Sequence, residues 1–534
     1  MSPKFMAAYH AVLHHALLLG FCLLLVPSHA LSKAIGDPDT SKLLTTADII
    51  AYAENSEVDI HDLYFHLRPY AGTQSCLTCH EQEGFEMLNT GHFRWAGKAV
   101  NIVGLEDQEH GKNDLINNFC IANATNEQRC SQCHAGFGYR DADYDFENPL
   151  NVDCLVCHDQ SGTYAKGAKT AGLPDPGVDL DKVARSITIG SKPTRKACIS
   201  CHAKAGGGDN VKHGDISTDL VATTREYDVH MGVDGADFSC VDCHAAKLDP
   251  ENGEVIHGIA GMSLHSVNEG KMRQCTDCHG DQLQIHRGYH VAGMFKNGRH
   301  ERLACQVCHI PAIARAISTK TEWYWSDAGQ DVDPIPIDPV SGRPTYDKMK
   351  GSFVWSYDVR PVLRYSNGKW NRKVVGANDK YDSVPIDLGS PVGDYDDPNA
   401  MIYPFKLMLG NQPVDPVTRT ILVPHLFGTA TGPSPYWGKY DWTGSLIDGA
   451  VYSGQEFSGT HVFEETRMLL SVNHEIAPAE DALGYYGCID CHGSRVIDWQ
   501  VLGWSEDPMM GGKRKRHNKP AMSHWRPPLK MTAD

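Results

Sequence analysis

The sequence predicts a mainly α-helical and irregular chain, with a small β-containing insertion in its second half and helices near its C-terminus. Glycine and proline interrupt residues 31–309 so often that only short helices and loops are expected there. Residues 353–357 and 362–365 are β-like stretches rich in aromatic and branched side chains. Between residues 457 and 483 the apolar positions approximate a helical face, formed by Phe463, Met468, Leu469 and Val472.

Four segments follow from this pattern. Residues 1–30 are expected to be a signal peptide, and 31–309 a region dense in short motifs. Residues 310–455 form a motif-free insertion rich in aromatic residues and proline, in which Asn367-Gly368 predicts a β-hairpin turn. Residues 456–534 are expected to be a C-terminal helical region that ends in a basic tail at 513–516.

The first 30 residues carry the features of an export signal. Lys4 supplies a positive start, residues 16–26 are apolar, and Ser28 and Ala30 are the small residues that a signal peptidase reads. Later in the chain no run of 18 apolar residues occurs, so we expect no transmembrane anchor. The expected location is the periplasm.

The charge of the chain excludes one class of partner. A formal net charge of −17 disfavours nucleic-acid binding, which requires a basic face. The run at 513–516 is the exception, and we interpret it as a solvated tail or a docking point for an acidic redox partner.

The cysteines show the strongest pattern in the chain. Of 18 cysteines, sixteen form pairs separated by two residues, and a histidine follows each pair directly. The eight motifs, numbered here in chain order, are Cys76/Cys79/His80, Cys130/Cys133/His134, Cys154/Cys157/His158, Cys198/Cys201/His202, Cys240/Cys243/His244, Cys275/Cys278/His279, Cys305/Cys308/His309 and Cys488/Cys491/His492.

This spacing is the one that attaches heme c. The two thiols form thioether bonds to the vinyl groups of one heme, and the histidine becomes the proximal ligand of its iron. Zinc sites do not require histidine immediately after the second cysteine. We therefore predict eight covalently bound hemes and a multiheme cytochrome c fold, in which the hemes supply much of the buried apolar area.

The distal ligands are less certain from sequence. Of 28 histidines, four lie in the first 30 residues and eight in the motifs, which leaves sixteen. That number suffices for two histidines on every heme, so counting alone does not reveal an open heme. The spare histidines with the most suggestive contexts are His92, His213, His230, His257, His286, His300 and His474. Trp323, Tyr324 and Trp325 are expected either to pack a loop or to stack on a heme edge.

Several segments resemble one family of multiheme cytochromes. The stretches 117–120, 129–134, 154–158 with 162–164, 206–215 and 467–474 are similar to the octaheme tetrathionate reductases, and more distantly to hydroxylamine oxidoreductase-like cytochromes. Seven motifs followed by one isolated motif also fit this family over nearly the whole chain.

The resemblance implies roles for individual residues. Seven hemes would have two histidine ligands, and the heme on Cys130, Cys133 and His134 would be catalytic with a distal lysine. Lys212 is the first choice for that lysine and Lys166 the alternative. Cys120 would lie near the catalytic heme, as a sulfur nucleophile or as a small buried residue. The resemblance also implies a calcium ion near the active site, whose ligands the sequence does not identify.

Three functions are consistent with these features. The leading one is reduction of a small inorganic substrate, tetrathionate or else nitrite and hydroxylamine, with electrons from a periplasmic or quinol-linked donor. The second is hydroxylamine oxidation, which needs a tyrosine cross-linked to heme, with Tyr485 and Tyr486 nearest to a motif. The third is an electron conduit in which all eight hemes have two histidine ligands.

Overall fold

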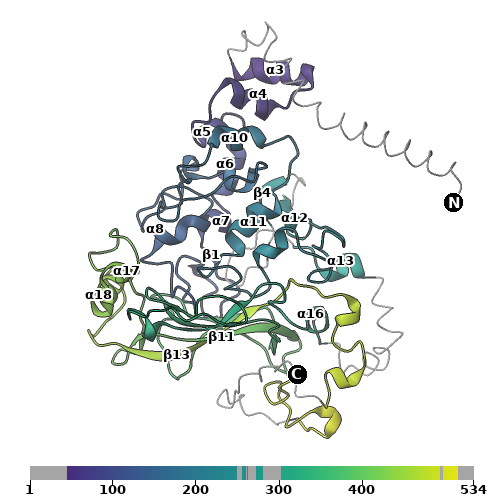
Figure 1. The fold of residues 1–534 in the computed structure, drawn as a ribbon, viewed down its shortest axis with the longest axis vertical. Helices are drawn as coiled ribbons and strands as arrows, with labels where there is room; N and C mark the ends of the chain where they lie inside the picture. Colours follow the sequence, from purple (N-terminus) through teal and green to yellow (C-terminus); the bar gives the residue numbers. More distant parts are fainter. Residues whose placement is uncertain are drawn as a thin grey trace, which may run out of the picture.

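The computed structural model describes residues 45–248, 255–259, 261, 272–280, 302–493 and 497–514. The expected signal peptide, His286, His300 and the end of the basic tail lie outside the described residues. Figure 1 shows an elongated molecule, with the first helices at one end, a β-sheet at the other and the motif-bearing segments between them.

Two helices cap the end of the molecule opposite the sheet. α3 (Thr46–Ser56) begins at a reciprocal hydrogen-bond pair between Thr45 and Asp48, and α4 (Ile60–Leu67) begins at Asp59, whose side chain accepts from the His61 backbone. Phe65 of α4 packs against Leu155 and Val183, which anchors this end to the motif region.

The motifs lie in short helical turns, as expected from the sequence. One turn brings residues three apart onto one face, so both thiols of a motif point to the same side. These turns are α5 (Gln74–Leu77), α8 (Glu127–Cys130), α9 (Leu155–His158), α11 (Arg195–His202), α12 (Cys240–Cys243), α13 (Cys275–His279), α16 (Cys305–His309) and the 3-10 helix η7 (Cys488–Asp490). Further short helices between them are α6 (Glu81–Met87), α7 (Gly91–Arg94), η2 (Ser131–Cys133), η3 (Pro149–Asn151), α10 (Leu180–Ser186) and η4 (Thr218–Val221).

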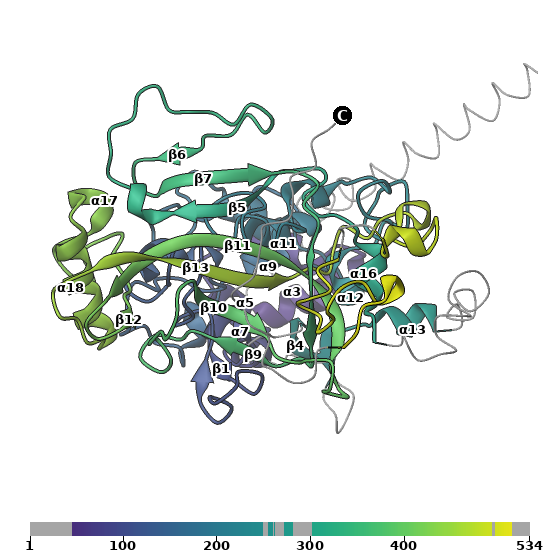
Figure 2. The ribbon, with the colours of Figure 1, turned by 90° about the horizontal axis from the view of Figure 1, so that it is seen from below.

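A nine-stranded sheet contains most of the insertion. Its order is β6-β7-β5-β11-β13-β10-β9, and β8 and β12 also pair with β11; Figure 2 shows these strands from below. The strands are β5 (Thr319–Tyr324), β6 (Tyr346–Asp347), β7 (Gly351–Ser356), β8 (Val362–Ser366), β9 (Trp370–Arg372), β10 (Ile386–Pro391), β11 (Met401–Asp415), β12 (Thr420–Ile421) and β13 (Val462–Ser471). Two small pairs, β1 (Gly97–Lys98) with β2 (Glu109–His110) and β3 (Ala246–Leu248) with β4 (Val255–Ile259), lie outside it.

The largest hydrophobic core lies between the sheet and the motif region. Met408 of β11 pairs with Met468 of β13, and Leu470 pairs with Lys406. These methionines and Leu470 cluster with Phe119 and other buried side chains from the segment before the second motif. The sheet therefore supports the segment that leads into that motif.

The expected C-terminal helix at 457–483 was wrong. Residues 462–471 form β13, which pairs with β11 through ten consecutive residues. Thr466, Met468 and Leu470 alternate toward the core, whereas Leu469 is buried on the other face with Phe405. Apolar residues on both faces of a central strand hide its period of two. In the described part of 456–514 the remaining regular elements are 3-10 turns: η6 (Ala479–Asp481), η7 and η8 (Pro508–Met510).

In the insertion, the two predicted strands are confirmed, but the predicted hairpin is not. Both β-like stretches are strands, β7 and β8, and Gly368 turns the chain with a φ of +90°. The two strands beside that turn do not pair with each other, because β8 pairs with β11 and β9 with β10, so the hairpin prediction was wrong. Trp323 and Trp325 are buried and stacked, in and directly after β5, rather than in a loop.

Two helices lie outside the sheet, and the basic tail contacts the rest of the molecule. α17 (Tyr436–Lys439) and α18 (Trp442–Ser453) lie beyond one end of the sheet (Figure 1), and η5 (Trp325–Asp327) follows β5. In the basic tail, Arg514 forms an ion pair with Asp396 and lies over Tyr395, so this residue is not a freely solvated charge. Among the described helices, none combines the length and the hydrophobicity that crossing a membrane requires.

Candidate functional site

Five motif histidines face a second histidine at a distance suited to one iron between them. A metal–imidazole bond is about 2 Å long, so two imidazoles on opposite sides of one iron have ring centroids about 6 Å apart. Within the described residues, five pairs have centroid separations of 5.6–6.2 Å: His61–His80, His158–His257, His92–His202, His244–His474 and His230–His279. The residues of these five sites therefore fit hemes with two histidine ligands.

A carboxylate lies beside each of two candidate distal ligands. Nδ1 of His61 lies 3.4 Å from Asp59, and Nδ1 of His474 lies 3.4 Å from Asp215. Histidines that bind metals commonly donate their second N–H to a carboxylate, which leaves Nε2 for the metal. Four of the five partners, all except His61, were among the candidates from sequence. The one signal for His61 was the aspartate two residues before it.

For the other three candidate distal histidines, the described structure shows no ring pair with a motif histidine. In the described structure His213 is buried, and its charge interacts with those of Lys212, Asp215 and His474 and with that of His202 in the fourth motif. His286 and His300 lie outside the described residues. The distal ligands of the seventh and eighth motifs remain predictions.

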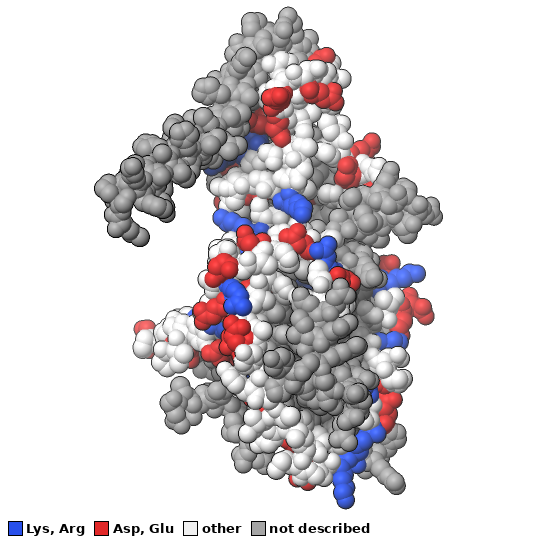
Figure 3. Space-filling model, turned by 90° about the vertical axis from the view of Figure 1, so that its right-hand side faces the viewer, with Lys and Arg blue, Asp and Glu red and all other residues white. Residues whose placement is uncertain are grey.

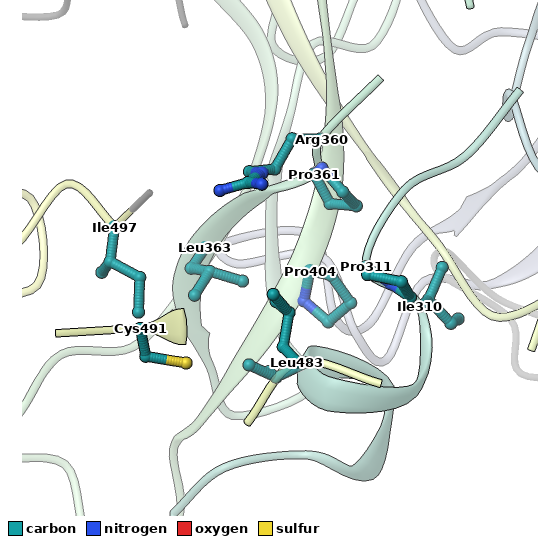
Figure 4. Close-up of a pocket in the computed structure, with 10 residues that line it drawn as sticks. Ile310, Pro311, Arg360, Pro361, Leu363, Pro404, Leu483, Cys491 and Ile497 are labelled. Atoms are coloured by element: carbon teal, nitrogen blue, oxygen red, sulfur yellow. The ribbon is translucent and has the colours of Figure 1, made fainter. Parts of the chain in front are cut away.

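The eighth motif borders an apolar groove suited to a porphyrin. Nδ1 of His492 lies 2.7 Å from Asp507, and its ring stacks on Trp499. Figure 4 shows this groove beside Cys491, with Arg360 at its edge. Apolar walls suit the ring of a heme, and a guanidinium suits its propionates. The walls are formed by Val307, Ile310, Pro311, Pro361, Leu363, Pro404, Leu483 and Ile497.

Thiols of different motifs lie side by side and define a path. Adjacent pairs are Cys76 with Cys154, Cys133 with Cys201, Cys198 with Cys240, and Cys275 with Cys305. Three further pairs are close enough for one thiol to act on the charge of the other: Cys157 with Cys198, Cys243 with Cys278, and Cys308 with Cys491. The motifs thus run in the order first, third, fourth, fifth, sixth, seventh, eighth, and the second motif branches from the fourth.

The second motif has different surroundings from the five histidine pairs. Among the described residues, the rings in contact with the His134 ring are those of Phe93, Trp95, Tyr139, Tyr144 and Phe146, at centroid distances of 5.1–6.1 Å, and none is a histidine. Burial lowers the pKa of His134 to about 3, so the imidazole stays neutral, as an iron ligand must.

Lys166 is committed to contacts around the backbone of this motif. Its ammonium group lies 3.0 Å from Asp153 and donates to the carbonyl oxygens of His134 and Gly136. Both side chains of the Lys166–Asp153 pair are nearly inaccessible, at 4% and 0% exposure. A lysine with these partners is poorly placed to bind iron on the side opposite His134.

Lys212, the first choice for the distal lysine, lies near a cysteine of the second motif. Its amine is near Cys133, and burial, together with the positive charges of Lys112 and Arg372, lowers the pKa of Lys212 to about 8. These surroundings favour the neutral amine, which is the form that binds a metal. The geometry therefore favours Lys212 over Lys166 as the distal lysine.

Two buried polar residues hold the loop that carries Lys212. Lys406 of β11 donates to the carbonyl oxygens of Val211 and Lys212 and to the hydroxyl of Thr319. Asn210, with a φ of +59°, donates to the carbonyl oxygen of Ile317. Neither residue was singled out in the sequence, because nothing in a lysine or an asparagine alone signals burial.

Cys120 lies beside the same loop and the second motif. A β-carbon on Gly207 would be 3.4 Å from the Cys120 sulfur, and Gly207 has a φ of +85°, so glycine suits this close approach. Cys120 also acts on the charge of Cys130. Burial raises the pKa of the Cys120 thiol, whereas Lys350, Lys320 and Arg129 act in the opposite direction. Cys120 and Lys212 thus both lie near cysteines of the second motif, and their roles there stay predictions.

The described residues do not reveal a calcium site. Among the described residues, no group of three or more histidine, cysteine, aspartate or glutamate side chains is arranged to hold a metal ion. Calcium remains a prediction from the resemblance.

The fold and the paired histidines define a multiheme c-type cytochrome. The chain matches two family models, "Cytochrome c554 and c-prime" over residues 75–159 and "Cytochrome c bacterial" over residues 320–495. The crystal structure of octaheme cytochrome c from Shewanella oneidensis is 34% identical, with a TM-score of 0.71, and the match covers 84% of this chain and 98% of that one. The chain belongs to the octaheme c-type cytochromes, with covalently bound heme c and a redox role.

A second relative covers less of the chain. An uncharacterized protein of Archaeoglobus fulgidus is 27% identical over 230 residues, which are 33% of this chain and 74% of that protein.

Proposed function

We propose that this chain is a periplasmic octaheme reductase of tetrathionate, or of nitrite and hydroxylamine, that acts at a lysine-ligated heme on the second motif. One observation carries the proposal. Five motif histidines have a second histidine at the separation expected across one iron, whereas the rings that contact His134 are those of phenylalanine, tryptophan and tyrosine. A heme without a second strong ligand is the one available to substrate.

The residues of the pocket have distinct roles in this proposal. Heme bound there would supply electrons and a Lewis-acidic iron. His134 and Lys212 would hold this heme, and the amine of Lys212 would be the weaker of the two ligands. Lys406 keeps the Lys212 loop in place. Lys112 and Arg372 make the surroundings positive, which suits anions such as tetrathionate and nitrite.

The order of the motifs supports delivery of several electrons. The second motif branches from the fourth, which lies within the path that joins the other motifs. Reduction of tetrathionate takes two electrons and breaks one sulfur–sulfur bond to give two thiosulfates. Reduction of nitrite to ammonium takes six electrons and eight protons and releases two waters. A store of eight hemes suits either reaction.

Two alternatives have less support. Tyr485 and Tyr486, the tyrosines beside the eighth motif, are 53% and 80% exposed, which is unlike a tyrosine cross-linked to a buried heme. The aromatic surroundings of His134 also disfavour a conduit in which every heme has two histidines.

A reductase assay tests the proposal. Reduced methyl viologen is supplied with tetrathionate, nitrite or hydroxylamine to the wild-type protein, to Lys212→Leu and to Lys204→Leu. Lys204 is an exposed lysine near the same motif and serves as the matched control. We expect activity with at least one substrate, its loss in Lys212→Leu and its retention in Lys204→Leu. Negligible rates with all three substrates in a fully heme-loaded protein would overturn the proposal.

A further inference from the structure

Glu127 is a buried carboxyl beside the second motif. It is 5% exposed, and its Oε2 atom is buried without a hydrogen-bond partner in the described structure. On the face shown in Figure 3, by contrast, the visible acidic side chains lie at the surface, interspersed with basic ones. The neighbouring charge that acts on Glu127, that of Asp141, is also negative. An ionised carboxylate is unfavourable in such surroundings, so they favour the neutral form.

One helical turn joins Glu127 to the point of heme attachment. Glu127 begins α8 and Cys130 ends it, and the backbone N–H of Ser131 donates to the carbonyl oxygen of Glu127. Side chains three residues apart on a helix lie on one face, with their β-carbons about 5–6 Å apart. The carboxyl is therefore next to the residue through which the heme of the second motif would be attached.

Two tyrosines connect Glu127 with the ligand of the second motif and with the surface. The charges of Glu127 and Cys130 both act on Tyr139, whose ring centroid is 5.2 Å from that of His134. On the other side, the hydroxyl of Tyr452 in α18 donates to Oε1 of Glu127 at 3.2 Å. Tyr452 is partly exposed, so its hydroxyl gives a proton a route between the buried carboxyl and water.

The groups around Glu127 do not replace it as a site that titrates near neutral pH. Burial raises the pKa of Glu127 to about 7. Burial also raises the pKa values of Cys130, Tyr139 and Tyr452, which stay neutral at this pH. Arg129, the cation of the same helix, donates to the carbonyl oxygen of Ala168. The two further charged residues, which act on Cys130 and Tyr139, are Lys112 and Asp114.

We propose that the carboxyl of Glu127 takes up a proton when the heme of the second motif is reduced. This inference goes beyond the proposed function, because it needs no substrate. Reduction removes one positive charge from the iron, and that charge stabilises a nearby carboxylate. One electron from the donor and one proton from water therefore arrive together, and the O–H bond of the carboxyl is the bond that forms.

The potential of this heme at several pH values tests the proposal without turnover. Wild type and Glu127→Gln are poised on an electrode between pH 5 and pH 9, and the heme is followed by its own magnetic circular dichroism band. At a fixed potential, the ratio of ferrous to ferric heme in wild type should fall about tenfold over this range, because the carboxylate stabilises ferric iron. Most of this dependence should be absent in Glu127→Gln.

Infrared spectra give a second measurement. The difference between reduced and oxidised wild type should contain the carbonyl band of a protonated carboxyl, and the spectrum of Glu127→Gln should lack that band.

Three further variants separate proton coupling from a structural effect. Glu127→Asp retains a titratable carboxyl and should retain the pH dependence. Tyr452→Phe removes a donor that favours the carboxylate, so the dependence should move to higher pH. Glu54→Gln, at an exposed glutamate of α3, removes one negative charge far along the chain and should match the wild type.

Four results would overturn the inference. The first two are equal pH dependence in wild type and Glu127→Gln, and a wild-type ratio that does not change with pH. The third is a dependence that appears only after a chelator removes divalent cations, which would assign the free carboxyl oxygen to a metal ion. The fourth is loss of the dependence in Glu127→Asp together with an altered heme spectrum, which would give Glu127 a structural role. Proton uptake that depends on Glu127 in a protein inactive with all three substrates would retain the inference and reject the reductase function.

Discussion

The ammonium nitrogen of Lys406 lies 3.2 Å from the carbonyl oxygen of Lys212, and 2.6 Å from that of Val211. Lys406 belongs to the central strand of the sheet, and Lys212 belongs to a loop between motifs. The side chain of Lys406 thus connects the sheet to the loop that carries Lys212, the candidate distal ligand. The insertion, which has no heme motif, therefore holds the loop that carries the proposed ligand Lys212.

Removal of this ammonium group should loosen the Lys212 loop. Lys406→Met keeps the length of the side chain but leaves two carbonyls without their donor, at a cost of about 1–3 kcal/mol for each buried group. We expect a severalfold lower kcat and a weaker lysine signature in the heme spectrum, with the histidine pairs unaffected. Lys369→Met, at a half-exposed lysine near the same sheet, is the control. Unchanged spectra and rates in Lys406→Met would contradict a positioning role.

Lys166 should contribute stability and not heme ligation. Lys166→Met leaves the buried Asp153 without its cationic partner, although the Tyr164 hydroxyl and the Val156 backbone still donate to it, so the free energy of unfolding should fall by about 3 kcal/mol. The combined change of Lys166→Met and Asp153→Asn removes both charges and should recover much of that loss. Guanidinium unfolding followed by circular dichroism measures both variants. Loss of the lysine signature in Lys166→Met but not in Lys212→Leu would reverse the assignment of the two lysines.

His61 should be the distal ligand of the first motif. Its ring centroid is 6.1 Å from that of His80. In His61→Ala, one low-spin heme should become high-spin, which electron paramagnetic resonance and the absorption of the ferric protein detect. His66→Ala, five residues further along α4, should leave every heme low-spin or lysine-ligated as in the wild type. A high-spin heme in His66→Ala instead would show that the pairing is misassigned.

Glu127 should make stability depend on pH. Burial raises the pKa of Glu127 from its ordinary value of 4.5 to about 7, and its Oε2 atom is buried without a partner in the described structure. The folded state therefore prefers the protonated carboxyl. Its contribution is complete below pH 4.5 and is lost as the pH rises through about 7.

Unfolding experiments at two pH values check this prediction. Between pH 5.5 and 8.5, the free energy of unfolding of wild type should fall by about 2 kcal/mol relative to Glu127→Gln. The glutamine keeps the contact with the hydroxyl of Tyr452 but carries no charge. Equal pH dependence in both proteins would show that Glu127 is not the group responsible.

The local structure of the motifs could be predicted from the sequence, because heme attachment needs only residues that are close together in the chain. Two thiols and a histidine within five residues need one helical turn, and every motif lies in or beside such a turn. The distal ligands depend on tertiary structure. His92, His230, His257 and His474 were proposed from their contexts, but the fold alone selects them and adds His61.

The sheet shows where local pattern fails. Apolar residues on both faces of β13 looked like a helical face, because a strand in the middle of a sheet has no solvent-facing side to mark its period. In the sequence Lys406 and Arg372 look like ordinary charged residues of strands, and only the assembled sheet buries them. The charges closest to the candidate chemistry were therefore the hardest to predict.

The central claim is that Lys212 binds the heme of the second motif. The most direct test is the ligand-sensitive near-infrared magnetic circular dichroism and electron paramagnetic resonance of the ferric protein, in wild type and in Lys212→Leu. We predict one heme with a lysine–histidine signature in wild type, replaced by a high-spin heme in Lys212→Leu, with the other hemes unchanged. Signatures of histidine pairs alone in the wild type, or a lysine signature that persists in Lys212→Leu, would contradict the account.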